Sequence, residues 1–245
     1  MESAAKTGGT EHIVGAYDDE LKKLTSLILR MGGLAESQLA AALQAVARRD
    51  TVLAEEVIET DQQLDDLESA VNTLTTRLLA LRQPVAVDLR VIVSSLRIST
   101  DLERIGDLAK NSAKRAMTLS QAAPVDAAQS IPRLGAMVQR MLQDVLDAFT
   151  KRDVDRAIEV WQRDEEVDRL YNSLFREYLT YMMEDPRNIT PCTHLLFIAK
   201  NLERIGDHAT NLAEAVYFLI NGARLREIRR KSDDTAAAVA TGANG

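Results

Sequence analysis

The sequence predicts an all-α protein built as two tandem three-helix bundles, six helices in all. Three observations favour this fold class. Helix formers are abundant, whereas glycine, proline and aromatic residues are scarce, with 11 Gly, 5 Pro and 4% aromatic residues. Apolar residues recur at steps of three and four. The hexapeptide Leu-Glu-Arg-Ile-Gly-Asp occurs at 102–107 and again at 202–207, which indicates an internal duplication.

The first half contains three apolar-periodic segments. One buried stripe runs from Leu21 to Val46 and stops at the polar corner 48–50. A second stripe runs from Val57 to Leu81, and Pro84 then marks a turn, because its ring cannot continue a helix interior. The third segment, 87–119, carries the first copy of the hexapeptide.

The second half repeats this order. Its first helix is expected over 134–149, and the corner Lys-Arg-Asp at 151–153 matches Arg-Arg-Asp at 48–50. A helix over 157–178 follows, a turn is expected at 185–186, and the last helix, 191–225, carries the second hexapeptide. We therefore predict repeats at 14–120 and 125–228, with disordered ends at 1–13 and 229–245, which have little to bury.

Charge and composition exclude several classes of protein. The net charge of −7 and the pI near 5.1 argue against nucleic-acid binding, which usually requires a basic surface. No segment approaches the ~18 uninterrupted apolar residues of a membrane span, and the first residues lack the apolar core of a secretion signal. One cysteine cannot form an internal disulfide, which fits a reducing compartment. We expect a soluble, cytoplasmic protein without membrane insertion.

Carboxylates come in pairs four residues apart, so that each pair lies within ~40° on one helix face. One pair lies in the second helix of each repeat and one in the third, which places two pairs on neighbouring helices. Like charges near an apolar stripe are costly unless they are paired or coordinated. The sequence therefore predicts metal ligands in both repeats: Asp61, Asp65, Glu103, Asp107, Asp164, Asp168, Glu203 and Asp207.

Oxygen-only ligation suits hard or borderline cations such as magnesium, manganese and iron, whereas zinc usually recruits His or Cys. His208 follows only the second copy of the hexapeptide, so we expect it beside the site or on the surface rather than as a ligand. Gly106 and Gly206 interrupt helices, which indicates that another helix approaches closely there.

The motifs resemble those of the PhoU family, the accessory proteins of the phosphate-specific transport system. The resemblance rests on the paired E(D)-x-x-x-D motifs, on the segment 202–214 and on the corner segments 82–90 and 185–189. It implies a non-enzymatic cytoplasmic regulator that represses the phosphate-starvation response. The implied partners are a phosphate-sensing histidine kinase and the ATPase subunit of the phosphate ABC transporter. It also implies a multinuclear iron or zinc cluster on the paired carboxylates.

The two repeats differ at Leu108 against His208 and at Glu68 against Tyr171, so equal metal occupancy is not expected. Helical bundles with remaining apolar stripes often dimerise, which favours a homodimer. Two alternatives stay open. One is a carboxylate-bridged metal oxidase or ferroxidase, although the Glu-x-x-His pairs of ferritin-like sites are missing. The other is a structural bundle whose carboxylates only form salt bridges with residues such as Arg104, Arg163, Lys200 and Arg204.

Overall fold

The computed structural model describes residues 7–225 and confirms the all-α fold class. The first bundle consists of α1 (Thr7–Arg48), α2 (Thr51–Arg82) and α3 (Ala86–Ser120). The second consists of α4 (Ile131–Lys151), α5 (Val154–Gln162), α6 (Asp164–Glu184) and α7 (Ile189–Asn221). Two 3₁₀ turns, Asp126–Ser130 and Pro186–Asn188, precede α4 and α7. No helix in the described range is long and apolar enough to span a bilayer.

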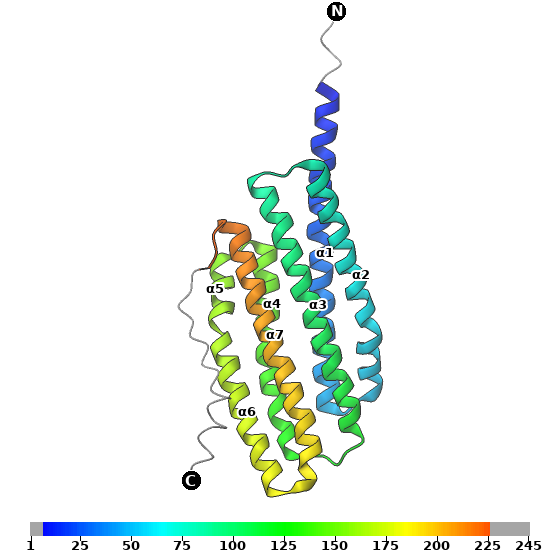
Figure 1. The fold of residues 1–245 in the computed structure, drawn as a ribbon, viewed down its shortest axis with the longest axis vertical. Helices are drawn as coiled ribbons and strands as arrows, with labels where there is room; N and C mark the ends of the chain where they lie inside the picture. Colours follow the sequence, from blue (N-terminus) through cyan, green and yellow to red (C-terminus); the bar gives the residue numbers. More distant parts are fainter. Residues whose placement is uncertain (1–6, 226–245) are drawn as a thin grey trace, which may run out of the picture.

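The two bundles pack side by side along their length (Figure 1). The third helices of the repeats, α3 and α7, lie against each other, and α1 lies against α4. The α1–α4 contact is reciprocal, because Gly32 of α1 packs on Leu146 of α4 while Gly135 of α4 packs on Leu43 of α1. The duplicated units therefore meet through equivalent surfaces.

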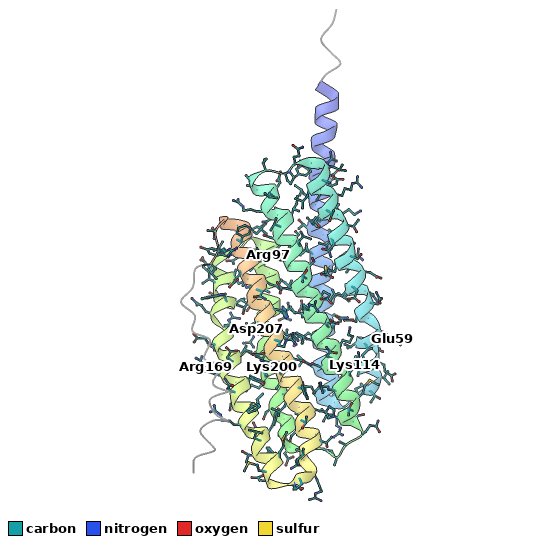
Figure 2. All side chains as sticks on the ribbon, in the orientation of Figure 1. Glu59, Arg97, Lys114, Arg169, Lys200 and Asp207 are labelled. Carbon is teal, nitrogen blue, oxygen red and sulfur yellow. The ribbon has the colours of Figure 1, made fainter. Side chains whose placement is uncertain are left out.

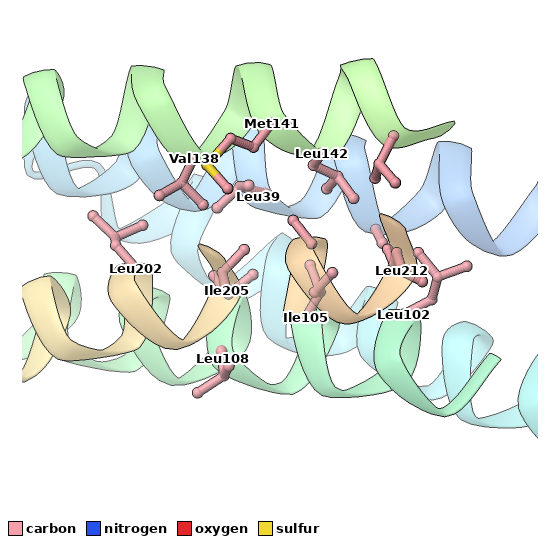
Figure 3. Packing of buried hydrophobic residues seen from close by; sticks show 14 of the residues in the cluster. Leu39, Leu102, Ile105, Leu108, Val138, Met141, Leu142, Leu202, Ile205 and Leu212 are labelled. Carbon is pink, nitrogen blue, oxygen red and sulfur yellow. The ribbon is translucent and has the colours of Figure 1, made fainter. Parts of the chain in front are cut away.

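Both hexapeptides contribute to a shared apolar core. Leu102 and Ile105 of the first copy and Leu202 and Ile205 of the second are fully buried. Figure 3 shows them with side chains of α1 and α4, among them Leu39. The apolar positions of each motif therefore fix the third helix in the core, which leaves the acidic positions of the same motif on the adjoining face.

The two polar corners are built in the same way. The backbone turns through the left-handed region at Arg49 (φ 56°) and at Arg152 (φ 55°). The next residue then caps the following helix: the Asp50 carboxylate accepts from the Leu53 N–H, and Asp153 accepts from the Arg156 N–H, both at 3.0 Å. Equivalent corners give the second helices of the two repeats the same starting point.

Two expectations about the helices were wrong. Residues 7–13, expected to be disordered, form the start of α1. The helix expected over 157–178 is interrupted at Arg163, so that α5 and α6 follow each other as one broken rod (Figure 1). The Arg163 N–H donates to the Val160 carbonyl at 3.2 Å, which tightens the last turn of α5, and acidic residues 164–166 favour a new helix N-terminus. The expected disordered tail, 229–245, lies outside the described residues.

Gly106 and Gly206 mark close helix approaches, as predicted. A Cβ atom on Gly106 of α3 would collide with Leu64 Cδ2 of α2 and lie 2.8 Å from Gln38 Oε1 of α1. A Cβ atom on Gly206 of α7 would lie 3.2 Å from Val167 Cγ1 of α6, which is a milder conflict. The first repeat is therefore packed more tightly at this point than the second.

We expect Gly106→Ala to lower the free energy of unfolding by about 1–3 kcal/mol, because overpacking outweighs the better helix propensity of alanine. Gly206→Ala should cost less. Gly33→Ala is the matched control, since nothing lies within 4 Å of its added Cβ, and it should stabilise the protein by up to ~1 kcal/mol. Urea unfolding followed by circular dichroism measures all three, and a Gly106→Ala protein as stable as Gly33→Ala would contradict the packing argument.

Candidate metal centre in each repeat

In the first repeat a lysine lies between the two acidic helices. The side chain of Asp61 on α2 is 7% exposed, and Lys110 on α3 donates to its Oδ2 atom. Lys110 Nζ also donates to Oδ1 of Asp107, one turn earlier on α3, at 2.5 Å. Burial alone would lower the pKa of Lys110, but these hydrogen bonds outweigh burial and raise that pKa. The ammonium is therefore a permanent cation that joins α2 to α3.

The other two predicted ligands of this repeat, Asp65 and Glu103, have raised pKa values. Burial is the main cause for both groups, and neighbouring carboxylates, including Asp107 and Glu68, add to it. Arg104 Nε lies 3.4 Å from Glu103 Oε2 and lowers the Glu103 pKa without cancelling the rise. Negative charge is thus crowded at this end of the first site, and a cation there would relieve the repulsion.

A buried amide faces the same place. Gln38 of α1 is 2% exposed, and neither its Nε2 nor its Oε1 atom has a hydrogen-bond partner among the described residues. Its Oε1 atom and Asp61 Oδ1 both border the backbone of Gly106. Buried amides are nearly always hydrogen-bonded, so this orphaned amide is consistent with a small polar ligand beside Asp61.

The second repeat holds its carboxylates differently. Asp164, in the first turn of α6, is 1% exposed, and its Oδ1 atom accepts from the Thr210 hydroxyl of α7 at 3.2 Å. Lys200 Nζ donates to Glu203 Oε1 at 2.8 Å and lies 5.2 Å from the centre of the Tyr171 ring. Figure 2 shows Lys200 and Asp207 along the same helix, α7. In this repeat the lysine therefore bonds a carboxylate of its own helix, and its ammonium group lies over an aromatic ring.

Glu203 of the second site is held in a buried and acidic environment. Its Oε2 atom is buried without a hydrogen-bond partner in the described part of the chain. Burial raises the pKa of Glu203, and the hydrogen bond from Lys200 offsets only part of that rise. The nearby charges of Asp207 and Asp168 raise the pKa further. Ionised Glu203 is thus held at a cost to the folded state.

His208 takes part in the contact between the repeats. Its Nδ1 atom lies 2.8 Å from Asp101 Oδ1 on α3, and Asn211 donates to the same carboxylate at 3.3 Å. The expectation that His208 is not a ligand stays a prediction. The histidine links α7 to α3 where the two repeats meet.

The donor set suits a hard cation, but the side chains are not arranged as a finished metal site. Among residues 7–225, no group of three or more His, Cys, Asp or Glu side chains is placed to hold a metal ion. The salt-bridge alternative describes part of what is seen, because Lys110, Lys200 and Arg104 each contact a predicted ligand. The eight metal ligands remain a prediction, and a metal would compete with these cations.

Sequence reasoning missed Lys110 and Gln38. Both lie on helical positions with no motif of their own, and only the approach of α1, α2 and α3 brings them to the carboxylates. One signal was nevertheless present for the lysine. When the sequences of the two third helices are aligned, Lys110 of the first repeat corresponds to Thr210 of the second, so the repeats differ at this position.

Comparison with known proteins decides the family. The model of the PhoU domain matches the chain twice, at residues 28–116 and 131–216. The chain belongs to the PhoU family. A Caulobacter vibrioides protein named phosphate-specific transport system accessory protein PhoU homolog is 57% identical over 225 residues, which is 91% of this chain and 98% of that protein. A Rhizobium meliloti protein of the same name is 50% identical over 226 residues, covering 92% and 95%.

Solved structures agree with this assignment. The crystal structure of PhoU from Pseudomonas aeruginosa superposes with a TM-score of 0.82 at 42% identity, covering 84% of this chain and 100% of that one. The phosphate transport system regulatory protein PhoU from Streptococcus pneumoniae gives 0.78 at 31% identity, covering 86% and 100%. The family resemblance predicted from the motifs is confirmed.

The raised pKa of Glu203 makes a prediction for stability against pH. An acid whose folded pKa exceeds its unfolded value of 4.5 destabilises the folded state above the folded pKa, and this cost vanishes as the pH falls below 4.5. Glu203→Gln is neutral throughout, so we expect it to melt above the wild type at neutral pH and to lose that advantage in acid. Scanning calorimetry at both pH values measures the difference.

The exposed Glu59→Gln variant is the control and should melt with the wild type at both pH values. A Glu203→Gln protein that melts below the wild type at neutral pH would show that the Lys200 contact, rather than burial, governs this carboxylate.

Proposed function

We propose that this chain is a non-enzymatic regulator of phosphate uptake that represses the phosphate-starvation response when phosphate is plentiful. The observation that carries the proposal is the match of the PhoU domain to both repeats. The relatives named as accessory proteins of the phosphate-specific transport system support it, because they align over nine-tenths of the chain. The regulator acts in the cytoplasm as an adaptor. Its partners are the ATPase subunit of the phosphate ABC transporter and the phosphate-sensing histidine kinase, and it works as a homodimer.

The adaptor surface is proposed to be braced by metal. A multinuclear cluster of iron or zinc, with magnesium or manganese as further options, binds the carboxylate pairs of α2 with α3 and of α6 with α7. A bound cation supplies positive charge that joins two helices of one repeat, so binding stabilises the folded surface. The raised pKa values of Asp65, Glu103 and Glu203 support this, because crowded carboxylates favour a cation.

The regulatory role predicts a phenotype in rich medium. A strain without this gene should express its phosphate-starvation genes in high phosphate, where the wild type keeps them silent. A transcriptional reporter measures this, and a plasmid copy of the intact gene should restore silence. If the deletion strain kept these genes silent in high phosphate, the regulatory assignment would be lost.

The metal role predicts a loss of affinity on substitution. Protein purified without chelator should contain bound metal by elemental analysis, and Glu103→Ala or Glu203→Ala should each weaken binding in its own repeat by at least ~10-fold. Glu59→Ala, at an exposed position of α2, is the control and should retain the metal content of the wild type. Metal no higher than background in the intact protein would discard the cluster while leaving the regulatory role untouched.

A further inference from the structure

We propose that a cavity on the second repeat binds a small anion with several phosphoryl groups in series, held by Arg133, Arg140 and Arg163. The cavity lies between α4 and the break that separates α5 from α6. None of the three arginines is a predicted metal ligand. The proposal therefore goes beyond the metal and regulatory roles and depends on neither.

The cavity has the size and the charge for a small anion. Its volume is about 540 Å³, and binding sites for small molecules usually measure ~300–1,000 Å³. The lining residues are Arg133, Ala136, Met137, Arg140, Arg163 and Glu166. Three arginines and one glutamate leave a net charge of +2 on this lining, although the whole chain is acidic. A negatively charged ligand is therefore favoured there.

Two of the arginines lie on one face of α4. Arg133 and Arg140 are seven residues apart, which is nearly two turns, so they are separated by about 10.5 Å along the helix axis. Both side chains are exposed, and within residues 7–225 neither makes an ion pair or a hydrogen bond. Guanidinium groups bind phosphoryl oxygens through two parallel hydrogen bonds.

This spacing favours an elongated anion. A ligand with phosphoryl groups in series can contact both guanidinium groups at once. A single phosphate contacts both only if the two side chains bend towards each other, which costs rotamer freedom. We therefore assign the cavity to a chain of phosphoryl groups rather than to one phosphate ion.

Arg163 is a fixed cation on the other side of the cavity. It lies at the break between α5 and α6, and it donates to Asp144 of α4. Its Nη2 atom also lies 3.7 Å from Glu159 Oε2. Arg156 donates to the same Asp144 carboxylate at 3.0 Å, so one negative charge is shared between two arginines. Positive charge therefore remains at Arg163 after these contacts, and the contacts hold its side chain in place.

The equivalent surface of the first repeat lacks this set of charges. The polar corners and the reciprocal glycines place equivalent residues 103 positions apart. The equivalents of Arg133, Arg140, Arg163 and Glu166 are Arg30, Ser37, Thr60 and Gln63. In addition, α2 passes through position 60 without a break. The first repeat therefore keeps one arginine of the three, and it provides a matched control surface in the same molecule.

Calorimetric titration of the full-length protein tests the proposal. The variants are Arg133→Gln, Arg140→Ser and Glu166→Gln, of which the last two install the residue of the first repeat. Arg30→Gln is the control, because it removes the same charge from the equivalent exposed position of α1. Each protein is titrated in chelator, at low and high salt, with sodium salts of tripolyphosphate, ATP, phosphate and hexaglutamate. Melting temperatures show whether each variant is folded.

We expect the wild type to bind tripolyphosphate, ATP or both more tightly than phosphate or hexaglutamate. Arg133→Gln and Arg140→Ser should each weaken this binding about tenfold, because each removes a charge-assisted contact. Arg30→Gln should bind like the wild type. Glu166→Gln should strengthen binding, because it removes the one negative charge of the lining. High salt should weaken binding by the wild type more than binding by Arg140→Ser, which makes fewer charged contacts.

The two phosphoryl ligands distinguish two sources of the same chemistry. Tighter binding of ATP than of tripolyphosphate identifies a nucleoside polyphosphate, and the reverse order identifies an inorganic polyphosphate. Either order supports the proposal.

Four results would overturn the proposal. The wild type could bind neither tripolyphosphate nor ATP. Phosphate could bind as tightly as both, which would reject the chain of phosphoryl groups. Hexaglutamate could bind as tightly, which would make the cavity a site for acidic peptides. Finally, Arg30→Gln could weaken binding as much as Arg140→Ser, which would show attraction by overall charge alone. If an arginine variant fails to fold, the gain expected for Glu166→Gln still decides the matter.

Discussion

The burial of one aspartate beside a close helix approach is the constraint on which both repeats depend. Asp61 and Asp164 are 5% and 1% exposed, and Asp61 lies beside Gly106, which lets the neighbouring helix come close. Breaking a buried ion pair by removing one partner costs several kcal/mol, whereas an exposed pair such as Arg169 with Glu165 contributes about 0–1 kcal/mol. The groups that bind these two aspartates therefore contribute far more to the stability of the bundle than its many exposed ion pairs do.

The duplication explains why the same constraint appears twice and why it is met in two ways. The reciprocal packing of α1 on α4 keeps the two units equivalent at their apolar contact. At the acidic faces the two repeats differ, because Lys110 contacts Asp61 on the neighbouring helix whereas Lys200 contacts Glu203 on its own helix. The contact of His208 and Asn211 with Asp101 is likewise one-sided, since Leu108 stands where the first repeat would need a histidine. Symmetry is thus retained in the apolar contact of α1 with α4 and broken in the polar contact of α3 with α7.

Much of the fold and part of the candidate site could be predicted from sequence. Helical periodicity reports which face of a helix is buried, so the core positions of the hexapeptide and the burial of Asp61 and Asp164 followed from spacing. The break at Arg163 did not follow from spacing. A buried acidic residue has the same apolar spacing around it whether it starts a helix or lies inside one. Lys110 was missed because periodicity does not report where a four-carbon side chain ends, and only the packing of α2 on α3 brings Asp61 within its reach.

The placement of the lysines bears on how such a bundle can act as an adaptor. A cluster neutralised by a covalently attached ammonium keeps its geometry whatever the supply of metal, because its counter-ion cannot diffuse away. A cluster that relies on a free cation gains a stability that rises with the logarithm of that ion's concentration relative to its Kd. Lys110 is such an attached counter-ion, because it contacts Asp61 on α2 and Asp107 on α3 and so joins the two acidic helices of the first repeat.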